Sequence, residues 1–391
     1  MSRNIFVFVV CGAAEHIDTL HLSLKYLSHF SKNEIIVVTD TSRNEIAINH
    51  HHIIDVKVDK KYNHHQASIY LKTGLHKFLP KGNNYCYLDT DVIALSVDCD
   101  NIFNEFAAPI TFAPDHCKVR KFSAYAVNCN CTSEWKKNRD LFNKYIESME
   151  RITIKDPYLL QKSKELQFHF NNMKNSTVKK IITAVRFFLS YPIFRLNNNF
   201  YFDRKARTWH LTSGEIVMYE VDVLKIQKET GLVYNKWNQK WYDKNGDDIW
   251  LDECNHLTTY IADTFQINVN EKNWQHWNGG VFLFNDESHD FLEAWFNKTM
   301  HIFTLPNWKT RDQGTLIATA WEFGLNNHPT LSKQWNFIAD YYNNGLMLDA
   351  EKGLITDDGF KTSYTPVFMH VYHNWGKKDW NIWQWIIGKI I

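Results

Sequence analysis

Short apolar runs that alternate with helical patterns constrain the fold of this chain more than any other feature. The apolar run Ile5–Val10 is followed by apolar residues at helical spacing over Leu20–Phe30, and Glu34–Asp40 is a second apolar run. A third run covers Ile53–Val58, and the amphipathic stretch Gln66–Leu79 comes after it. Strands that alternate with helices form a parallel, doubly wound sheet, whose ligands bind at the carboxyl ends of its strands.

Two aspartates stand at the end of the next predicted strand. Asp89 and Asp91 flank Thr90 between the apolar runs Tyr85–Leu88 and Val92–Leu95. Two carboxylates at a strand end can share a hard divalent cation, and such a cation can neutralise a diphosphate. An Asp-rich turn that closes a hairpin has the same sequence, so both interpretations stay open at this point.

The composition disfavours some partners and favours others. The 391 residues include 44 basic and 43 acidic side chains, a net charge of +1, so bulk charge does not favour nucleic acid. Aromatic residues make up 15% of the chain, and such rings pack against sugar faces or lie at membrane interfaces. No run of about 20 apolar residues occurs, so we expect no membrane-spanning helix.

The cysteines and the N-terminal apolar run indicate in which cellular compartment the protein is expected. The seven cysteines are scattered, and Cys129-Asn130-Cys131 is tighter than the usual zinc-binding spacing, so we expect reduced thiols. The first apolar run leads into Glu15-His16 and a helical pattern, which favours a buried strand over a signal peptide. We therefore predict a cytoplasmic protein.

The alternation of strands and helices gives way to another pattern over residues 130–270. Glu134–Ile152 has a helical pattern, and Lys236–Trp250 is typical of a hairpin with a turn at Asn245-Gly246. Strand and turn signals resume after this stretch. We interpret residues 130–270 as an aromatic-rich insertion within a single catalytic domain that covers residues 1–391.

Two motifs follow the insertion. Asn278-Gly279-Gly280 stands directly before an apolar strand, where glycine lets the backbone approach a ligand and the Asn amide both donates and accepts hydrogen bonds. Asp312-Gln313-Gly314 precedes a helical run. Asp312 either caps that helix or acts at a reacting carbon, and the sequence leaves both open.

A histidine-rich segment near the end of the chain supplies further candidate ligands. His370 and His373 offer imidazoles for a metal, Gly376 allows a tight loop, and Lys378 offers a cation for phosphate. A single histidine in such a segment is more often structural. The order of the pieces therefore carries more information than any one of them.

Taken in order, these motifs resemble the glycosyltransferase family 8 type of nucleotide-sugar transferases, which includes glycogenin-like and bacterial lipopolysaccharide enzymes. The resemblance covers residues 3–115 and 275–380. It implies an α/β fold of the GT-A type, a Rossmann-like mixed sheet flanked by helices. It also implies a hexosyltransferase that uses a UDP-sugar, retains anomeric configuration, and acts on a glycan or glycolipid acceptor.

The resemblance assigns roles to individual residues. Asp89, Asp91 and His373 would bind Mn²⁺ or Mg²⁺, with His370 as a competing ligand. Gln313 would lie near the anomeric carbon with Asp312 beside it. The implied donor-binding residues are Cys11, Gly12, Ala13, Asp40, Lys72, Asp89, Thr90, Asn278, Gly279, Gly376 and Lys378.

The chain departs from the family pattern in three places. The stretch from Asp91 to Asn278 is far longer than usual, and Gly314 stands where an acidic residue is common. The last motif lacks one residue before its lysines and has Asp379 in place of proline. If the enzyme inverts configuration instead, we favour Asp312 over Asp252 or Glu253 as the base.

The aromatic residues suggest where an acceptor binds. The candidate sugar-stacking rings, with core packing as the alternative for each, are Trp237, Trp241, Trp250, Trp274 and Trp277. The segments Lys179–Leu189 and Trp380–Ile391 are basic or Trp-rich and typical of helices at a membrane surface, with packing onto the domain as the alternative. A carbohydrate-binding module without catalysis explains the aromatic residues but leaves Asp89 and Asp91 without a role.

Overall fold

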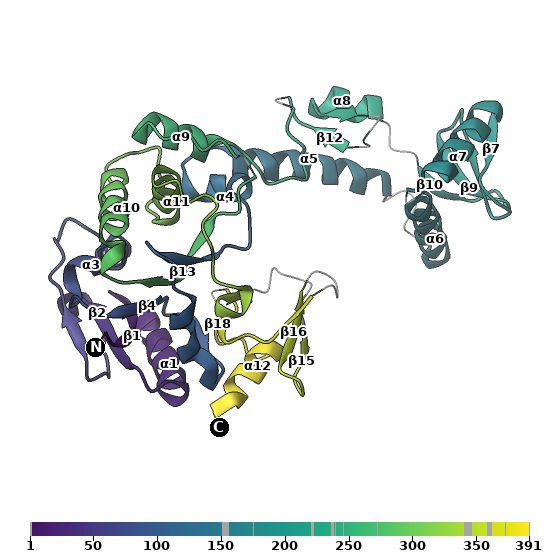
Figure 1. Cartoon of the computed structure of the whole chain (residues 1–391). Coiled ribbons are helices and arrows are strands. Elements are labelled where there is room, and N and C mark those ends of the chain that lie inside the picture. The colour runs from purple at the N-terminus through teal and green to yellow at the C-terminus, as the bar shows by residue number, and fades with distance from the viewer. Residues whose placement is uncertain are drawn as a thin grey trace. The chain divides into compact units, whose positions relative to one another are not determined.

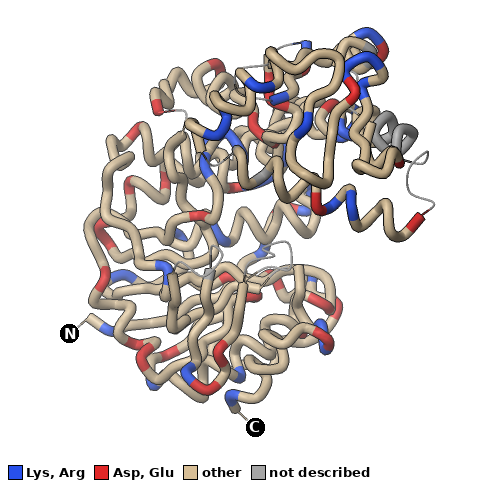
Figure 2. The backbone as a smooth tube through the Cα atoms, turned by 90° about the vertical axis from the view of Figure 1, so that its right-hand side faces the viewer, with Lys and Arg blue, Asp and Glu red and all other residues tan. Residues whose placement is uncertain are grey.

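The computed structural model divides the chain into two compact units. It describes residues 2–150, 156–174, 176–219, 223–235, 238, 240–244, 246–271, 273–339, 346–357, 362–371 and 373–390. The first unit comprises residues 1–129 and 253–391, and the second comprises residues 130–252 (Figure 1). Basic and acidic residues are interspersed along both (Figure 2), in keeping with the small net charge.

A six-stranded sheet forms the centre of the first unit. Its order is β3 (Ile53–Asp55), β2 (Glu34–Thr39), β1 (Asn4–Val9), β4 (Asn84–Leu88), β13 (Trp277–Phe284) and β6 (Thr111–Pro114). The strands β1 to β4 are parallel, whereas β13 is antiparallel to β4 and β6. The predicted class, a mixed α/β sheet flanked by helices, is therefore confirmed, and the parallel arrangement holds for β1 to β4 only.

The central strands are apolar on both faces because a core lies on each side of the sheet. Along β1, Ile5 and Val7 face one core, and Phe6 and Phe8 face the other. Such continuous apolar runs are typical of strands covered by helices on both sides. The run that resembled a signal peptide is thus a buried central strand.

Helices cover both faces of this sheet. On one face pack α2 (His64–Thr73), α3 (Leu75–Phe78), α4 (Val119–Ala126), α9 (His256–Phe265), α10 (His289–Ile302) and α11 (Gln313–Glu322). On the other face pack α1 (Ala14–Phe30) and the 3₁₀ turns η2 (Val97–Glu105) and η4 (Lys333–Trp335). The single helix predicted over residues 66–79 is two helices, because the chain leaves helical geometry at Gly74.

Two small sheets and a C-terminal helix complete the first unit. One sheet contains β14 (Phe337–Ile338), β18 (Phe368–His370) and β5 (Val92–Ala94), and the other contains β15 (Met347–Asp349), β16 (Leu354–Asp357) and β17 (Thr362–Tyr364). The helix α12 (Asn381–Ile387) buries Ile382, Trp383 and Ile386. The alternative of a tail packed onto the domain therefore describes this segment.

The second unit has two small cores. Its helices are α5 (Cys131–Glu150), α6 (Pro157–Lys174), α7 (Thr177–Leu189) and α8 (Val223–Thr230). An antiparallel sheet contains β10 (Ile216–Tyr219), β9 (Thr208–Leu211), β8 (Phe200–Asp203) and β7 (Ile193–Arg195). A separate pair contains β11 (Val233–Asn235) and β12 (Lys240–Tyr242). Gly246 has a φ of +84° in the tight turn after β12, while Asn245 lies outside the described residues.

The described helices show no membrane span. None of them is long and apolar enough to cross a bilayer. This agrees with the absence of a long apolar run in the sequence.

Candidate active site at the ends of β4, β6 and β13

The turn that carries Asp89 and Asp91 is held by two neighbouring segments. The Asp89 amide donates to the Gly280 carbonyl at 2.8 Å, and the Val371 amide donates to the Asp91 carbonyl at 3.0 Å. The turn joins β4 to β5, so the first expectation, a carboxylate pair at a buried strand end, is what the structure shows. Because β13 and the segment after β18 both reach this turn, residues far apart in sequence meet there.

Asp89, Asp91 and His370 form a group of potential metal ligands. Their ligand atoms lie within 4.8 Å of one another. His370 Nε2 is 3.2 Å from an Asp91 oxygen, and Asp91 raises the pKa of His370 although burial opposes its charge. Two carboxylates and an imidazole suit a divalent cation such as Mn²⁺. His373, which the sequence spacing favoured, is exposed and is not in this group.

Lys72 links the carboxylate pair to the start of α11. Its ammonium nitrogen lies 3.2 Å from an Asp89 oxygen and 3.0 Å from an Asp312 oxygen. Burial opposes the charge on Lys72, but Asp312 and Asp89 raise its pKa above the ordinary value. Asp312 occupies the position before α11, yet its side chain makes no capping hydrogen bond. The ion pair with Lys72, rather than helix capping, is the structural role of this carboxylate.

Asp115 joins two of the predicted site residues. It follows β6, and one of its oxygens accepts hydrogen bonds from the Asn278 amide at 3.0 Å and from the Gln313 amide at 2.9 Å. Burial opposes its charge, but His116, His276 and the Asn278 amide lower the pKa of Asp115 well below its usual range. A buried, ionised carboxylate therefore fixes which way both amides point.

The same chain of hydrogen bonds reaches the metal-ligand group. The Asn278 oxygen accepts from the Asn336 amide at 3.0 Å, and Asn336 in turn contacts His370 Nδ1 at 3.1 Å. Gln313, Asp115, Asn278, Asn336 and His370 thus form one connected polar network. Fully satisfied networks of this kind hold side chains rigidly in one arrangement.

Sequence reasoning missed Asp115 and did not use Asn336 as a site residue. A signal for Asp115 was present, because Ile110–Ala113 is an apolar run that ends in Pro114-Asp115, as the run before Asp89 ends in an aspartate. Asn336 follows a short 3₁₀ turn. The pair Trp335-Asn336 is one of the ordered motifs behind the family resemblance, but that resemblance implied no role for Asn336 itself. Only the parallel placement of β4 and β6 on either side of β13 brings these residues together.

Three glycines around the site leave no room for a side chain. A Cβ on Gly280 would lie 2.5 Å from the His370 ring, and one on Gly279 would lie 3.2 Å from the Lys72 ammonium. A Cβ on Gly314 would lie 3.0 Å from Trp308. The last contact leaves little space for a larger side chain at position 314.

The residues predicted near the nucleotide lie in two loops, one between β1 and α1 and one after β2. The Gly12 amide donates to the Asn44 side chain at 3.1 Å, and Gly12 has a φ of +108°, which favours glycine. Cys11 and Ala13 flank it at the start of α1, and burial raises the pKa of Cys11 to about 11. Asp40 is 1% exposed, and its oxygens accept from Ser42, Arg43 and Val58.

The remaining predicted donor residues lie on turns and loops. Thr90 lies within the carboxylate turn, and its carbonyl accepts a hydrogen bond from Ser23 at 2.6 Å. Gly376, with a φ of +74°, and Lys378 are exposed on the loop that follows β18. The structure does not bring them into the polar network.

The candidate stacking rings are mostly core residues. Trp277 and Trp274 are buried in the first unit, and Trp241 is buried in the second. Trp250 is 48% exposed. Trp237 lies outside the described residues.

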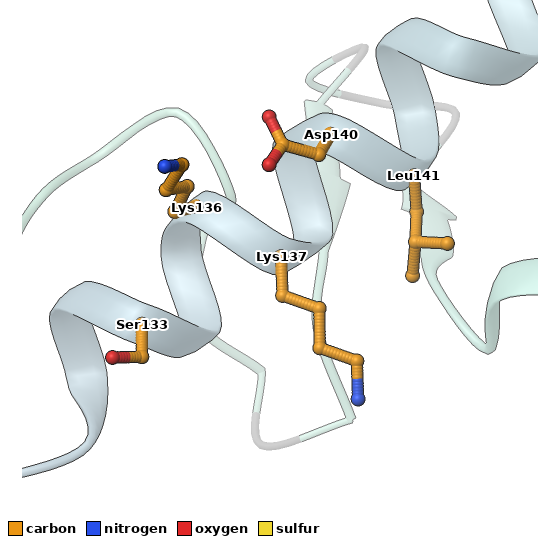
Figure 3. Close-up of a pocket in the computed structure, with 5 residues that line it drawn as sticks. All are labelled: Ser133, Lys136, Lys137, Asp140 and Leu141. Atoms are coloured by element: carbon orange, nitrogen blue, oxygen red, sulfur yellow. The ribbon is translucent and has the colours of Figure 1, made fainter.

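Two pockets in the described part of the chain lie away from the polar network. One, of about 400 Å³, is lined by residues of α5 alone, and Figure 3 shows Lys137 and Leu141 pointing to one side of that helix. The other, of about 350 Å³, is lined by residues before β4 and after β13, such as Pro80 and Asn285. That is the opposite end of these strands from Asp89.

Comparisons with known proteins found similar solved structures but no matching family or curated protein. The chain is similar to mouse xyloside xylosyltransferase 1 in its apo form, with 11% identity, 95% of this chain and 98% of that chain covered, and a TM-score of 0.38. It is also similar to the bifunctional glycosyltransferase WbbM, with 9% identity, 86% and 40% covered, and a TM-score of 0.35.

A third likeness covers a smaller part of the chain. The galactosyltransferase LgtC, solved with donor and acceptor sugar analogues, has 12% identity, 28% of this chain and 46% of that chain covered, and a TM-score of 0.20. We therefore infer the function of this chain from the residues of its site.

Proposed function

We propose that this chain is a metal-dependent glycosyltransferase that moves a hexose from a UDP-linked sugar to a glycan or glycolipid acceptor with retention of configuration. One observation supports the proposal above all. Two sets of contacts, one through Lys72 and one through Asp115, connect Asp312 and Gln313 at the start of α11 with the carboxylates of the turn after β4.

The carboxylate turn is the proposed donor-phosphate site. Asp89, Asp91 and His370 would hold Mn²⁺ or Mg²⁺, and such a cation, when bound, neutralises charge on a departing diphosphate. Lys72 keeps Asp89 oriented and adds a positive charge close to it. The exposed Lys378 and Gly376 belong to the loop that we propose contacts the phosphates from the other side, and His373 on that loop is the alternative ligand.

The pairing of side chains near the sugar favours retention over inversion. The amide nitrogen of Gln313 is held by Asp115, so its amide oxygen remains for the sugar. Asp312 pairs with the Lys72 ammonium at 3.0 Å, so its carboxylate is already engaged within the protein. An inverting reaction needs a carboxylate base, whereas a retaining transfer from the leaving-group side does not.

For the acceptor we propose the second unit. Trp250 is its exposed candidate ring, and α7 exposes apolar residues beside basic ones. The exposed apolar residues of α7 are Val178, Ile181, Ile182, Val185, Phe188 and Leu189. Lys179, Lys180 and Arg186 lie on the same helix, a pattern that suits an anionic membrane surface and a glycolipid acceptor. Co-sedimentation with anionic vesicles tests this contact, and equal binding by a Phe188→Glu, Leu189→Glu variant would contradict it.

Calorimetric titration of UDP with and without Mn²⁺ is the experiment that tests the proposed function. We expect manganese-dependent binding in the parent protein and in Asp290→Asn, a control at an exposed carboxylate of α10. Asp91→Asn should abolish it. UDP-sugars are then screened, and NMR of the product gives the anomeric configuration.

Two outcomes would reject the proposal. Absence of UDP binding both with and without Mn²⁺ would remove the proposed donor site. Glycan binding that survives Asp91→Asn without any transfer would favour the carbohydrate-binding module instead.

A further inference from the structure

A second group of potential metal ligands lies outside the proposed active site. The ligand atoms of Cys129, Cys254 and His256 in the first unit lie within 4.8 Å of one another. Cys129 lies 125 and 127 positions before Cys254 and His256, which are two positions apart from each other. None of the three belongs to the polar network of the proposed active site. Their convergence is therefore a property of the fold rather than of local sequence.

The backbone around these residues is anchored within the first unit. The Cys254 amide donates to the Arg120 carbonyl at 3.0 Å, and the Asn128 amide donates to the Asn307 carbonyl at 2.9 Å. The Ser123 hydroxyl is the common neighbour, because it contacts the Cys254 thiol at 3.1 Å and accepts from the Leu257 amide at 2.9 Å. The Cys254 thiol and the backbone beside Cys129 are thus held in place before any ion binds.

We propose that Cys129, Cys254 and His256 of the first unit bind a zinc ion. Cys129 comes from the first segment of that unit, and the pair Cys254-Asn255-His256 comes from its second segment. The spacing Cys129-Asn130-Cys131 alone is too tight for a usual zinc site, and the fold supplies ligands from the distant pair instead.

The chemistry of this group selects zinc over the cation proposed at Asp89. Two thiolates and an imidazole form a soft, nitrogen- and sulfur-containing set, which suits Zn²⁺ rather than Mn²⁺ or Mg²⁺. Tetrahedral zinc with Zn–S of about 2.3 Å and Zn–N of about 2.0 Å has sulfur and nitrogen ligand atoms about 3.5–3.8 Å apart. The observed limit of 4.8 Å admits that geometry with small movements of side chains. Each thiol that binds releases its proton, so binding strengthens as the pH rises.

The position of the group suggests what the ion does. Cys129 ends the first segment of the first unit, and Cys254 lies one residue after that unit resumes at Glu253. Zinc would join the two points of the first unit between which residues 130–252 are inserted. A cross-link of this kind stabilises the folded state by restricting the unfolded chain and by binding the folded form alone.

Metal analysis of the full chain tests the proposal. Protein produced with zinc in the medium and freed of loosely bound metal should contain about one zinc per chain by mass spectrometry. Cys254→Ala and His256→Ala should each lose most of it. Cys99→Ala is the matched control, because Cys99 is a buried cysteine outside the group, and it should retain the zinc. Asp91→Asn should retain it as well, which separates this ion from the one proposed at the active site.

Cobalt substitution gives a second readout that does not depend on the stability of the variants. Co²⁺ bound by thiolates in a tetrahedral site gives intense charge-transfer and visible absorption bands, and we expect these in the parent and in His256→Ala at reduced strength. A chelator should lower the melting temperature of the parent and leave Cys254→Ala unchanged. Less than a tenth of an equivalent of zinc together with no cobalt band in the parent, or full zinc retained by Cys254→Ala, overturns the proposal.

Discussion

The two units of this chain bury carboxylates in different ways. In the second unit, Asp248 is 9% exposed, accepts from the Trp250 amide at 3.0 Å and pairs with the Lys240 ammonium at 2.8 Å, so these partners are two and eight residues away. In the first unit, Asp115 is 8% exposed and accepts from Asn278 and Gln313, which are 163 and 198 residues away. A buried charge is costly unless it is paired, and partners that are close in sequence are enough to support a turn. Carboxylates that gather amides, a lysine and a histidine from distant segments are better explained by a site.

The largest effect should separate these two kinds of carboxylate. We expect Asp91→Asn to reduce transfer about 1,000-fold, because it removes a metal ligand and the partner of His370. Asp248→Asn should lower the free energy of unfolding by about 1–3 kcal/mol through its turn, with transfer per folded molecule unchanged. Initial rates with the donor found by screening and chemical unfolding curves measure both. Equal loss of transfer in the two variants would break the distinction.

A buried tryptophan of the first unit and an exposed tryptophan of the second unit should respond differently to substitution. Trp277 is 2% exposed and stacks on Phe112 with ring centroids 5.2 Å apart, whereas Trp250 is 48% exposed. Trp277→Ala should therefore cost about 3–5 kcal/mol of unfolding free energy. Trp250→Ala should cost less than about 0.5 kcal/mol and raise the KM for the acceptor. An unchanged acceptor KM in Trp250→Ala would remove that ring from the proposed acceptor site.

Asp115 should behave as a positioning residue for Gln313. Asp115→Asn replaces an acceptor with an amide that competes for the same hydrogen bonds, and we expect kcat to fall about 100-fold with little change in KM for the donor. Gln313→Ala should give a similar loss. Because the two residues act together, the double variant should lose much less than the product of the single losses. Multiplicative losses in kcat would show that Asp115 acts independently of Gln313.

Sequence patterns predicted the parts of the site that are local in sequence. The strand before Asp89 and the apolar strand after Gly280 were visible as apolar runs, since burial on both faces requires them. The antiparallel direction of β13 was not, because an apolar run has no direction. Without that direction, Asp115 had no reason to be grouped with Asn278, and the contact of Asn336 with Asn278 was not predictable.

The choice between His370 and His373 shows a second limit. The spacing to Gly376 favoured His373, and spacing is all that a sequence offers there. In the structure, β18 pairs with β5 and places His370 opposite Val92, next to Asp91. Strand register, which depends on long-range pairing, thus decided which imidazole meets the carboxylates.

Asp40 gives the smallest expected effect and tests whether a predicted donor residue is structural. Burial would raise the pKa of Asp40, but Ser42, Val58 and Lys57 lower it from 3.8 to about 2. The folded state therefore favours the ionised form, which contributes about 2 kcal/mol above pH 4. This contribution is lost as the pH falls from about 4 through about 2. Asp40→Asn should be less stable than the parent by that amount at pH 7.

Urea unfolding of the parent and of Asp40→Asn at pH 7 and pH 3 measures this difference. We expect the two curves to lie closer together at pH 3, because Asp40 in the unfolded chain is then largely protonated. Donor binding per folded molecule should be unchanged if Asp40 only supports the loop after β2. A weaker affinity for UDP with unaltered stability would instead show that Asp40 contacts the nucleotide. The donor site would then include the loop after β2.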